Sequence, residues 1–496
     1  MDTREMTGTD QQFDTDVLII GAGVIGCMAA RELSRYKLDI TVLERNSDVC
    51  EGSSKSNSGL IHAGFHPRGG SLKGRGCVEG NAMYERLCAE LDVPLKRTGS
   101  LYVAFGPNGE EGISKKYKNG IQNGVPDLRI ISGDEARSIE PCLSRYVISA
   151  LWAPTAAIIS PFKLVVALYE SALKNGVRFE LSTEVRNIYP CGGKTDPVGW
   201  KIETADGRLF HTRYVINAAG DQAEPLDAQV HPADLVIRPR RGQFYVFDKN
   251  SQIKTPVYQA QETDEGGILV TPTIEGNLLA GPTSEDVPDY THTETTKDGL
   301  AKVLQVTKKI FPGVDPGDII TSFAGVRANI KNIEKETKDF VVRLSARHFV
   351  SALGIKNPGM SAAPALVRRM VDLLKEDGMT AEPDPGFDPI RTAYVPFLQL
   401  DEARQKELIV TDAAYARVIC RCENITEGDL RHIAAQYSCP HTIEAIKCRL
   451  RTGMGRCQGG FCTPRVLSIL SEIWQIPPEK IPYSEAGGAV CMGAIK

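Results

Sequence analysis

The chain has 496 residues, which is enough for two or three domains around a large hydrophobic core. Its formal net charge is −4 and its basic residues do not cluster, so nucleic acid is not expected as a partner. Met1–Asp16 is polar and acidic, and no apolar run is long enough to cross a bilayer. These features favour a cytoplasmic protein without a signal peptide or a transmembrane segment.

A strand, a helix and a second strand follow one another at the start of the chain. Asp16–Ile20 is an apolar run of strand length, Cys27–Tyr36 has helical spacing, and Ile40–Leu43 has strand composition. Between the first strand and the helix, the sequence is Gly-Ala-Gly-Val-Ile-Gly. In this strand–turn–helix context, the glycine pattern predicts a dinucleotide site at the N-terminus of the helix.

The residue types in this pattern have separate physical roles. Gly21 permits the tight turn, Gly23 allows the backbone to approach a pyrophosphate, and Gly26 allows the helix to pack closely on the strand. Glu44 ends the second strand, where it could accept hydrogen bonds from a ribose diol. An acid at this position argues against a 2′-phosphate, despite Arg45 beside it. We therefore predict that these five residues belong to the cofactor site.

The next segment, Ser53–Gly64, is small and polar and ends on an apolar pair and a histidine. Such a segment could run beside a bound cofactor and place the imidazole of His62 near the reactive ring. A solvated serine loop with an incidental histidine is an equally good interpretation of these residues taken alone.

The residues Asn57–Gly64, with Ser71–Lys73 and Cys77–Gly80, resemble the glycine-oxidase and D-amino-acid-oxidase superfamily of flavoproteins. Within it, they are similar to type 2 glycerol-3-phosphate oxidases and dehydrogenases and to L-2-hydroxyglutarate oxidases. The resemblance implies FAD as the cofactor and His62 as the catalytic base. It also implies a Rossmann-like α/β FAD-binding domain with an inserted antiparallel-sheet substrate domain. The residues that it places along the flavin are Ser53, Asn57, Ser58 and Gly59.

The middle of the chain adds further expectations. Gly99–Phe105 is predicted to be a strand, followed by a lysine- and glycine-rich surface stretch, and Ser160–Pro161 predicts the start of a helix. Arg213–Gly220 is a strand that runs into small residues, which suit close approach to a cofactor or simply a tight exit from a buried strand. The resemblance implies that Gly220 lies against the flavin nucleotide and that the backbone of Val185 meets the adenine.

A strand-rich pattern over Leu235–Ser322 predicts the antiparallel sheet of the substrate domain, and Phe323–Arg327 follows it. The arginine could be an ordinary surface charge, although a planar guanidinium suits a clamp on a carboxylate or phosphate. In the flavoproteins that the chain resembles, an arginine at this position holds the anionic group of the substrate. We therefore expect Arg327 to contact the substrate.

The last part of the predicted flavin domain is the strand Phe349–Leu353, a glycine-rich turn and a helix over Ala365–Leu374. N–H groups at the start of the helix could stabilise charge on a reduced flavin ring. The resemblance covers Phe13–Glu376 and is closer here to the glycerol-3-phosphate group than to the hydroxyglutarate group. The predicted cofactor contacts from this turn are Gly354, Gly359 and Met360.

One departure from that group concerns the substrate. The glycerol-3-phosphate group carries a lysine in the loop before the strand at Ile268. Here Tyr258–Gly267 contains none and is acidic, with Glu262, Asp264 and Glu265. The sequence is therefore compatible with a substrate that carries a carboxylate as well as with one that carries a phosphate.

Cysteine usage is uneven, because seven of the 13 cysteines lie in the last fifth of the chain. An odd total without a secretion signal argues against a disulfide framework and favours a metal site. The pattern is Cys420-x-Cys422 and then Cys457-x4-Cys462, with predicted helices at Ile425–Leu430 and from Thr463. Structural zinc and redox-active dithiols are alternatives to an iron–sulfur cluster, which needs four thiolates.

The segment Val418–Ile476 resembles the bacterioferritin-associated ferredoxin-like [2Fe–2S] domain, most specifically over Gly455–Cys462. The resemblance implies a [2Fe–2S] cluster with Cys420, Cys422, Cys457 and Cys462 as its ligands. Three other cysteines of this region fall outside the motif and are expected to be small buried hydrophobes: Cys439, Cys448 and Cys491.

These features together predict an FAD-dependent oxidoreductase over residues 13–378, with substrate-domain segments at about 86–150 and 231–325. Residues 379–412 are expected to form a linker, 413–480 the small, mainly helical [2Fe–2S] domain, and 481–496 a tail. The leading reaction is oxidation of glycerol 3-phosphate to dihydroxyacetone phosphate. L-2-hydroxyglutarate, another 2-hydroxy acid or an amine substrate is the alternative. Electrons would pass singly to a partner subunit or carrier, and the sequence is compatible with an oligomer.

Overall fold

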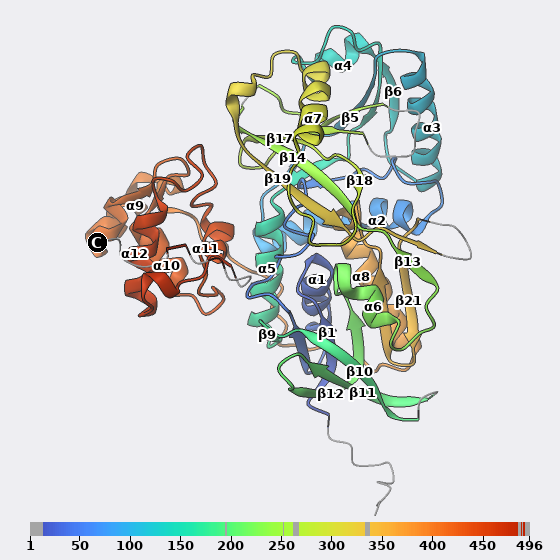
Figure 1. Ribbon diagram of the computed structural model, residues 1–496, viewed down its shortest axis with the longest axis vertical. Helices are drawn as coiled ribbons and strands as arrows, with labels where there is room; N and C mark the ends of the chain where they lie inside the picture. The colour runs from blue at the N-terminus through green and yellow to red at the C-terminus, as the bar shows by residue number, and fades with distance from the viewer. Residues whose placement is uncertain are drawn as a thin grey trace, which may run out of the picture.

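The computed structural model describes residues 13–193, 196–250, 252–260, 267–332, 338–484, 488 and 490–491. Most of the chain forms one elongated body, and the C-terminal segment forms a small helical lobe at its side (Figure 1). One sheet lies toward each end of the body. A helix that combines the length and the apolar character of a membrane span is absent from these ranges.

The first sheet is built around β1 (Thr15–Ile20), in which the apolar residues from Val17 onward are buried. β2 (Ile40–Leu43) and β12 (Leu209–Asn217) lie parallel to β1 on its two sides. The strand order is β10-β11-β12-β1-β2-β9, and β22 and β21 extend the sheet from β12. The remaining strands are β9 (Arg178–Glu180), β10 (Val185–Gly192), β11 (Pro197–Thr204), β21 (Val341–Ala346) and β22 (Phe349–Leu353).

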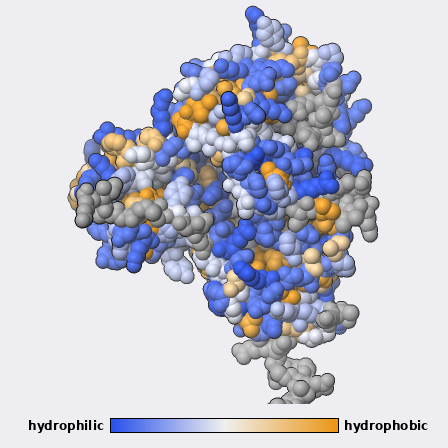
Figure 2. Space-filling model, viewed as in Figure 1, coloured by the Kyte–Doolittle hydropathy of each residue, from blue (hydrophilic) through white to orange (hydrophobic). Residues whose placement is uncertain are grey.

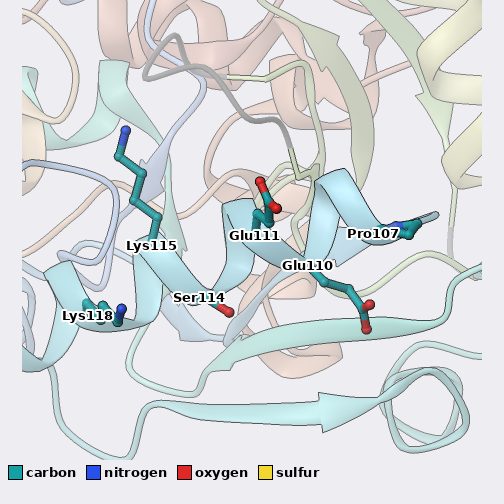
Figure 3. Close-up of a pocket in the computed structure, with 6 residues that line it drawn as sticks. All are labelled: Pro107, Glu110, Glu111, Ser114, Lys115 and Lys118. Atoms are coloured by element: carbon teal, nitrogen blue, oxygen red, sulfur yellow. The ribbon is translucent and has the colours of Figure 1, made fainter.

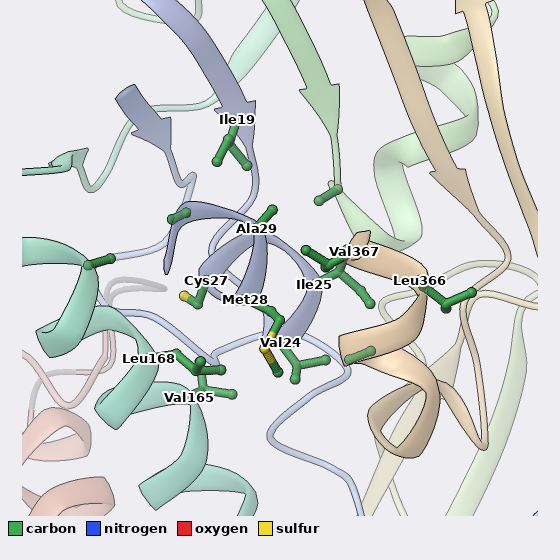
Figure 4. Packing of buried hydrophobic residues seen from close by; sticks show 14 of the residues in the cluster. Ile19, Val24, Ile25, Cys27, Met28, Ala29, Val165, Leu168, Leu366 and Val367 are labelled. Carbon is green, nitrogen blue, oxygen red and sulfur yellow. The ribbon is translucent and has the colours of Figure 1, made fainter. Parts of the chain in front are cut away.

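Helices cover this sheet and form the largest hydrophobic core. Helix α1 (Val24–Leu33) packs between α5 (Pro161–Lys174) and α8 (Gly359–Glu376), and α2 (Leu72–Leu91) packs on α8. Figure 4 shows α1 between the two helices, with Cys27 on the side of α5 and Ile25 beside Val367 of α8. The predicted start of α5 is confirmed, because Ser160 caps it by accepting a hydrogen bond from the backbone N–H of Lys163.

The second sheet confirms the predicted inserted sheet. Its order is β18-β14-β17-β16-β15-β5-β7-β6, with β19 paired to β14, and every pairing is antiparallel except that of β15 with β5. Helices α3 (Pro107–Asn123), α4 (Gly133–Ile139) and α7 (Lys297–Ile310) pack on it. Its strands are β5 (Ser100–Ala104), β6 (Arg129–Ser132), β7 (Ser149–Ala153), β14 (Arg240–Lys249), β15 (Val257–Gln259), β16 (Leu269–Pro272), β17 (Asn277–Gly281), β18 (Glu285–Asp286) and β19 (Ile319–Arg327).

Shorter elements connect the two sheets. β8 (Ala157–Ile159) lies between β3 (Leu60–Ile61) and β4 (Leu95–Arg97), and β13 (Leu235–Ile237) pairs with β20 (Ile330–Asn332). Short helices at Gly220–Gln222, α6 (Ala223–Asp227) and Pro316–Asp318 complete the body.

The lysine- and glycine-rich surface stretch after β5 is the helix α3, which buries Ile113 and exposes much of its length. Two local predictions were wrong. α1 begins at Val24 and ends at Leu33, so it lies three residues N-terminal to the predicted helix at both ends. α8 begins at Gly359, which puts Pro364 inside it. A proline at this place cannot donate to the carbonyl of Met360, and that carbonyl instead accepts a hydrogen bond from the Tyr84 hydroxyl at 2.5 Å.

The C-terminal lobe has its own hydrophobic core. Both predicted helix starts are confirmed, because Thr426 and Asp429 form a capping box at α10 (Glu427–Ala434) and α12 (Thr463–Trp474) begins at Thr463. Cys439 and Cys448 are buried as expected, whereas Cys491 is only partly buried. The other elements are α9 (Glu402–Thr411), β23 (Val418–Cys420), β24 (Ile425–Thr426), α11 (Ile443–Leu450) and short helices at Phe397–Gln399, Ala413–Ala416 and Pro478–Lys480.

A buried ion pair joins the lobe to the body. Arg449 of α11 donates to both carboxylate oxygens of Asp48, at 2.6 and 3.1 Å, and both side chains are 3% exposed. The same guanidinium donates to the carbonyl of Ser438 at 2.7 Å. On the face seen in Figure 2, the surface is mostly hydrophilic, with small scattered apolar areas. Among the ion pairs that join the described residues of the lobe and the body, the Arg449–Asp48 pair is the most buried.

Asp48→Asn is expected to loosen the lobe, because it leaves the Arg449 charge buried without a counter-charge, at a cost of about 3–5 kcal/mol. The lobe should detach, which faster tryptic cleavage within residues 379–412 and a larger radius of gyration in X-ray scattering would show. Glu382→Gln removes the exposed Lys37–Glu382 pair and is the matched control, expected to change stability by less than about 1 kcal/mol. A compact, cleavage-resistant Asp48→Asn protein would contradict this account of the joint.

Candidate active site

A cavity of about 1140 Å³ lies where the two sheets meet. On one side, its wall consists of residues that follow the carboxyl ends of β1, β2, β12 and β22. On the other side, residues of β14, β15 and β19 complete it. Open α/β sheets bind ligands at the carboxyl ends of their strands, and this volume is large enough for an extended cofactor together with a small substrate.

A second hollow lies on α3 and is lined by Pro107, Glu110, Glu111, Ser114, Lys115 and Lys118 (Figure 3). All six residues come from that one helix, so no other described element contributes a polar group to it. The larger cavity, which is lined by residues of both sheets, is therefore the candidate active site.

The turn between β1 and α1 has the geometry that its glycines predicted. Gly21 has φ +98°, and a Cβ there would lie 2.7 Å from the carbonyl oxygen of Ala218. A Cβ on Gly26 would lie 1.8 Å from the carbonyl oxygen of Gly21, so only glycine allows this helix–strand contact. Gly21 and Gly23 lie on the cavity wall, which leaves the N-terminus of α1 facing the space where a pyrophosphate would bind.

Glu44 is buried on the cavity wall beside this turn. Its carboxylate accepts hydrogen bonds from the backbone N–H groups of Ala22 at 2.6 Å and Asn46 at 2.9 Å. Burial raises the pKa of this carboxyl, and the two N–H groups act in the opposite direction. A carboxylate has further lone pairs, so it can still accept from a ribose diol. Arg45, also on the wall, pairs with Asp221 at 3.1 Å.

The serine-rich segment is fixed to the protein on both sides, so it is not a solvated loop. The Ser54 hydroxyl accepts from the N–H of Val24 at 3.0 Å, and the Ser53 hydroxyl donates to the carbonyl of Val326 at 3.1 Å. Asn57 and Ser58 also lie on the cavity wall. The segment therefore connects the start of α1 to β19 along the middle of the cavity.

Several other predicted residues lie on the wall: Gly220, Gly359 and Met360. Four do not, namely Gly26, Gly59, Val185 and Gly354. Gly59 and Gly354 have φ of +74° and +65° and pack against Ile159 and Ile330, so they shape the backbone behind the wall.

His62 follows β3 and is 6% exposed. Its backbone N–H donates to the Ser361 hydroxyl at 2.8 Å, and its carbonyl accepts from the Asn81 amide at 2.9 Å. Its Nδ1 lies 3.1 Å from the Tyr258 hydroxyl. Burial lowers the pKa of His62 to about 4, against a smaller opposite effect of a hydrogen bond with Asn357. The imidazole is therefore neutral at physiological pH.

Two aromatic residues beside His62 were not predicted. Tyr258 lies on the wall, and so does His66, whose ring centroid is 4.6 Å from that of Tyr258. His66 is buried, and its Nε2 has no hydrogen-bond partner among the described residues. The sequence signal for His66 is only its position four residues after His62, because nothing in the local pattern shows that both rings face one cavity.

A group of cations faces the same cavity. Arg327 lies at the end of β19 and donates to the carbonyl of Thr283 at 2.7 Å. Lys356 lies in the turn before α8 and donates to the Asn329 side chain. Burial, together with neighbouring cations that include Arg327, lowers the pKa of Lys356 to about 7. The sequence analysis did not predict a role for Lys356, although this residue lies in the glycine-rich turn from which cofactor contacts were expected. The loop that lacks the expected lysine lies outside the described residues over 261–266.

In the lobe, the predicted metal ligands lie on two neighbouring loops. A hydrogen bond from Cys462, together with backbone N–H groups, lowers the pKa of Cys420 to about 6. A Cβ on Gly455 would lie 2.1 Å from the Cβ of Cys422, so this glycine lets the second loop pass closely over that ligand. Cys457 is exposed.

Across the described residues, no three His, Cys, Asp or Glu side chains surround a single point at metal-binding distance. A [2Fe–2S] cluster takes four thiolates, and Cys420, Cys422, Cys457 and Cys462 on these loops provide that donor set.

Comparisons with known proteins agree with this geometry. A family model described as FAD dependent oxidoreductase matches residues 16–373. The chain belongs to this family. A second model, the BFD-like [2Fe-2S] binding domain, matches residues 418–472. The chain is thus an FAD-dependent oxidoreductase that also carries a [2Fe–2S] domain, as its sequence predicted.

Three relatives illustrate the range of the family. A glycerol 3-phosphate dehydrogenase from Caloramator mitchellensis is 39% identical over 97% of this chain and 99% of its own length. A mitochondrial L-2-hydroxyglutarate dehydrogenase from Arabidopsis thaliana is 27% identical over 72% of this chain and 83% of its own. The solved structure of L-alpha-glycerophosphate oxidase from Mycoplasma pneumoniae with FAD bound has a TM-score of 0.70 and 29% identity, covering 77% of this chain and 99% of that one.

Glu44→Gln is expected to weaken FAD binding by this oxidoreductase about 10- to 100-fold, because hydrogen bonds to a charged group contribute about 1.5–3 kcal/mol. The new amide would also direct N–H groups at the backbone donors of Ala22 or Asn46. Titration of the apoprotein with FAD, followed by flavin fluorescence, measures the change. Glu51→Gln is the matched control, because Glu51 lies on the same loop but off the cavity wall. Equal affinities in both variants would remove Glu44 from the site.

Proposed function

We propose that this oxidoreductase oxidises a small anionic secondary alcohol and passes the electrons from FAD through the [2Fe–2S] cluster to an external acceptor. The leading reaction is oxidation of glycerol 3-phosphate to dihydroxyacetone phosphate. The observation that carries the proposal is that a buried neutral histidine, His62, shares one cavity with the cations Arg327 and Lys356. The relatives named for glycerol 3-phosphate support it, since one of them matches nearly the whole chain.

His62 is suited to take the proton of the substrate hydroxyl. If Nδ1–H donates to the Tyr258 hydroxyl, Nε2 keeps a lone pair that can accept this proton from the substrate oxygen, while the carbon that bears the hydroxyl loses its hydride. Burial raises the pKa of Tyr258, so the phenol stays neutral and cannot take the proton itself. The bound FAD supplies the hydride acceptor.

Arg327 and Lys356 are suited to hold the anionic end of the substrate. A guanidinium and an ammonium that both line the cavity provide a planar clamp and a point charge for phosphate. An anion bound between them would stabilise the charged form of Lys356, whose pKa in the free protein is about 7. Affinity for the anion should therefore depend on the protonation of Lys356.

A 2-hydroxy acid is the second candidate substrate. Residues 258–267 contain no lysine and three acids, and an L-2-hydroxyglutarate dehydrogenase is among the relatives. Anaerobic mixing of the holoprotein with glycerol 3-phosphate, L-2-hydroxyglutarate and small amino acids decides between them, because only a substrate bleaches the flavin absorbance. Bleaching by the hydroxy acid alone would overturn the leading reaction, and bleaching by none would overturn the proposal.

His62→Ala should slow flavin reduction by about 10²- to 10⁴-fold while the flavin stays bound, since it removes only the proton acceptor. Stopped-flow absorbance under anaerobic conditions measures the rate, and the flavin spectrum of the same sample confirms occupancy. A variant that reduces its flavin at the rate of the unmodified protein would show that His62 is not the base.

The pH dependence of kcat/KM is expected to be bell-shaped. As the pH falls through about 4, His62 becomes protonated and activity is lost on the acid side. As the pH rises through about 7, Lys356 loses its charge and the KM for an anionic substrate increases. Lys356→Gln should raise KM at pH 6 by at least about tenfold and remove the alkaline limb. The ionisation of the substrate affects the variant and the unmodified protein equally. An alkaline limb that is unchanged in the variant would therefore show that Lys356 does not cause it.

A further inference from the structure

The four predicted cluster ligands are not equally covered. Cys420 and Cys462 are buried and Cys422 is partly buried, whereas Cys457 is exposed. A cluster held by these thiolates would therefore approach the protein surface on the side of Cys457. Electrons that leave the lobe would take their shortest path to solvent there.

Phe461 lies on the same loop and is 58% exposed. The guanidinium carbons of Arg421 and Arg465 lie 5.7 and 5.9 Å from the centre of its ring. These residues are next to the ligands, because Arg421 separates Cys420 from Cys422 and Phe461 precedes Cys462. An exposed aromatic ring with two arginines beside it has the composition that is enriched at the centre of protein interfaces.

The charge on this face is not neutralised within the described part of the chain. Neither Arg421 nor Arg465 has an ion pair with an acid there, whereas the nearby Arg417 pairs with Glu427 at 2.7 Å. In the two ligand loops, residues 417–424 and 451–466, the one acid is Glu423. Glu423 is itself occupied, at 3.0 Å, by Arg451. Arg456, beside Cys457, pairs with Asp248 of the body at 3.3 Å, so the unpaired positive charge on these loops lies at Arg421 and Arg465, in a chain whose net charge is −4.

Building on the proposed function, we propose that Arg421, Phe461 and Arg465, which we name the exit face, dock an acidic one-electron carrier protein. The substrate loses two electrons and two protons. Two oxidised carriers then take one electron each in succession, and the protons pass to solvent. Positive charge around the exit would attract a carrier whose own redox centre is surrounded by carboxylates and would orient it for transfer.

Equilibrium binding to the holoprotein tests the exit face directly. The probe is an acidic plant-type [2Fe–2S] ferredoxin, and binding is measured by calorimetry at 20 and 200 mM salt. The expected result is an affinity that falls with salt, and a loss of at least about tenfold in the double variant Arg421→Glu, Arg465→Glu. Lys406→Glu is the matched control, because Lys406 is an exposed cation on α9, away from the ligand loops.

Two further variants separate charge from ring packing. Arg421→Lys with Arg465→Lys keeps the charge and should retain most of the affinity, whereas Phe461→Ala should weaken binding at both salt concentrations. Equal affinity of the unmodified protein and the charge-reversed variant would overturn the proposal. A change in the oligomeric state of the charge-reversed variant, without a change in ferredoxin binding, would also overturn it, because the face would then join two copies of this chain.

Electron transfer gives a second measurement. Ferricyanide is an anionic one-electron acceptor and hexaammineruthenium(III) is a cationic one. The charge-reversed variant should reduce ferricyanide more slowly and the cation faster, with anaerobic flavin bleaching by substrate unchanged. If the unmodified and the charge-reversed proteins reduce each acceptor at the same rate and both bleach normally, the exit face is contradicted and the proposed function is not. Absent bleaching in the unmodified protein would contradict the proposed function, and the binding measurement would still decide the exit face.

Discussion

The position of the site depends on one close contact, between α1 and the end of β1. The carbonyl oxygen of Gly21 lies where a side chain on residue 26 would be, so the helix approaches the strand more closely than any other residue would allow. This approach directs the N–H groups of α1 at the cavity, where Ser54 already accepts from Val24. The serine-rich segment and β19 are attached to that point in turn, through Ser53 and Val326.

Burial then sets the charge of the groups that do the chemistry. His62 is enclosed by protein, and desolvation lowers its pKa to about 4, which keeps the base neutral. Lys356 experiences the same penalty and the repulsion of other cations, and its pKa is about 7. A neutral proton acceptor and a charged anion clamp can therefore coexist in one cavity between these two values. The environment, more than the residue types, separates the two roles.

The joint between the body and the lobe follows a different principle. Its centre is the buried Arg449–Asp48 pair, while contacts such as Arg456–Asp248, at 3.3 Å, lie nearer to solvent. A buried pair contributes little net stability but penalises any arrangement that leaves one charge unpaired. The pair thus selects one orientation of the lobe. In that orientation Cys457 and the exit face stay on the outside.

Much of this protein was determined by local sequence. The strand–glycine–helix pattern, the caps at Ser160 and Thr426 and the cysteine spacing each encode a short piece of backbone. The structure confirms the first strand and the helix starts at the two caps. The family patterns also predicted which segments form the cavity. Only the tertiary structure brought Lys356, Arg327 and His66 to one wall and left Val185 and Gly354 off it. It also showed that the glycine-rich stretch after β5 is a helix. The reason is physical: backbone conformation responds to near neighbours in the chain, whereas burial and pKa depend on residues that only folding brings together.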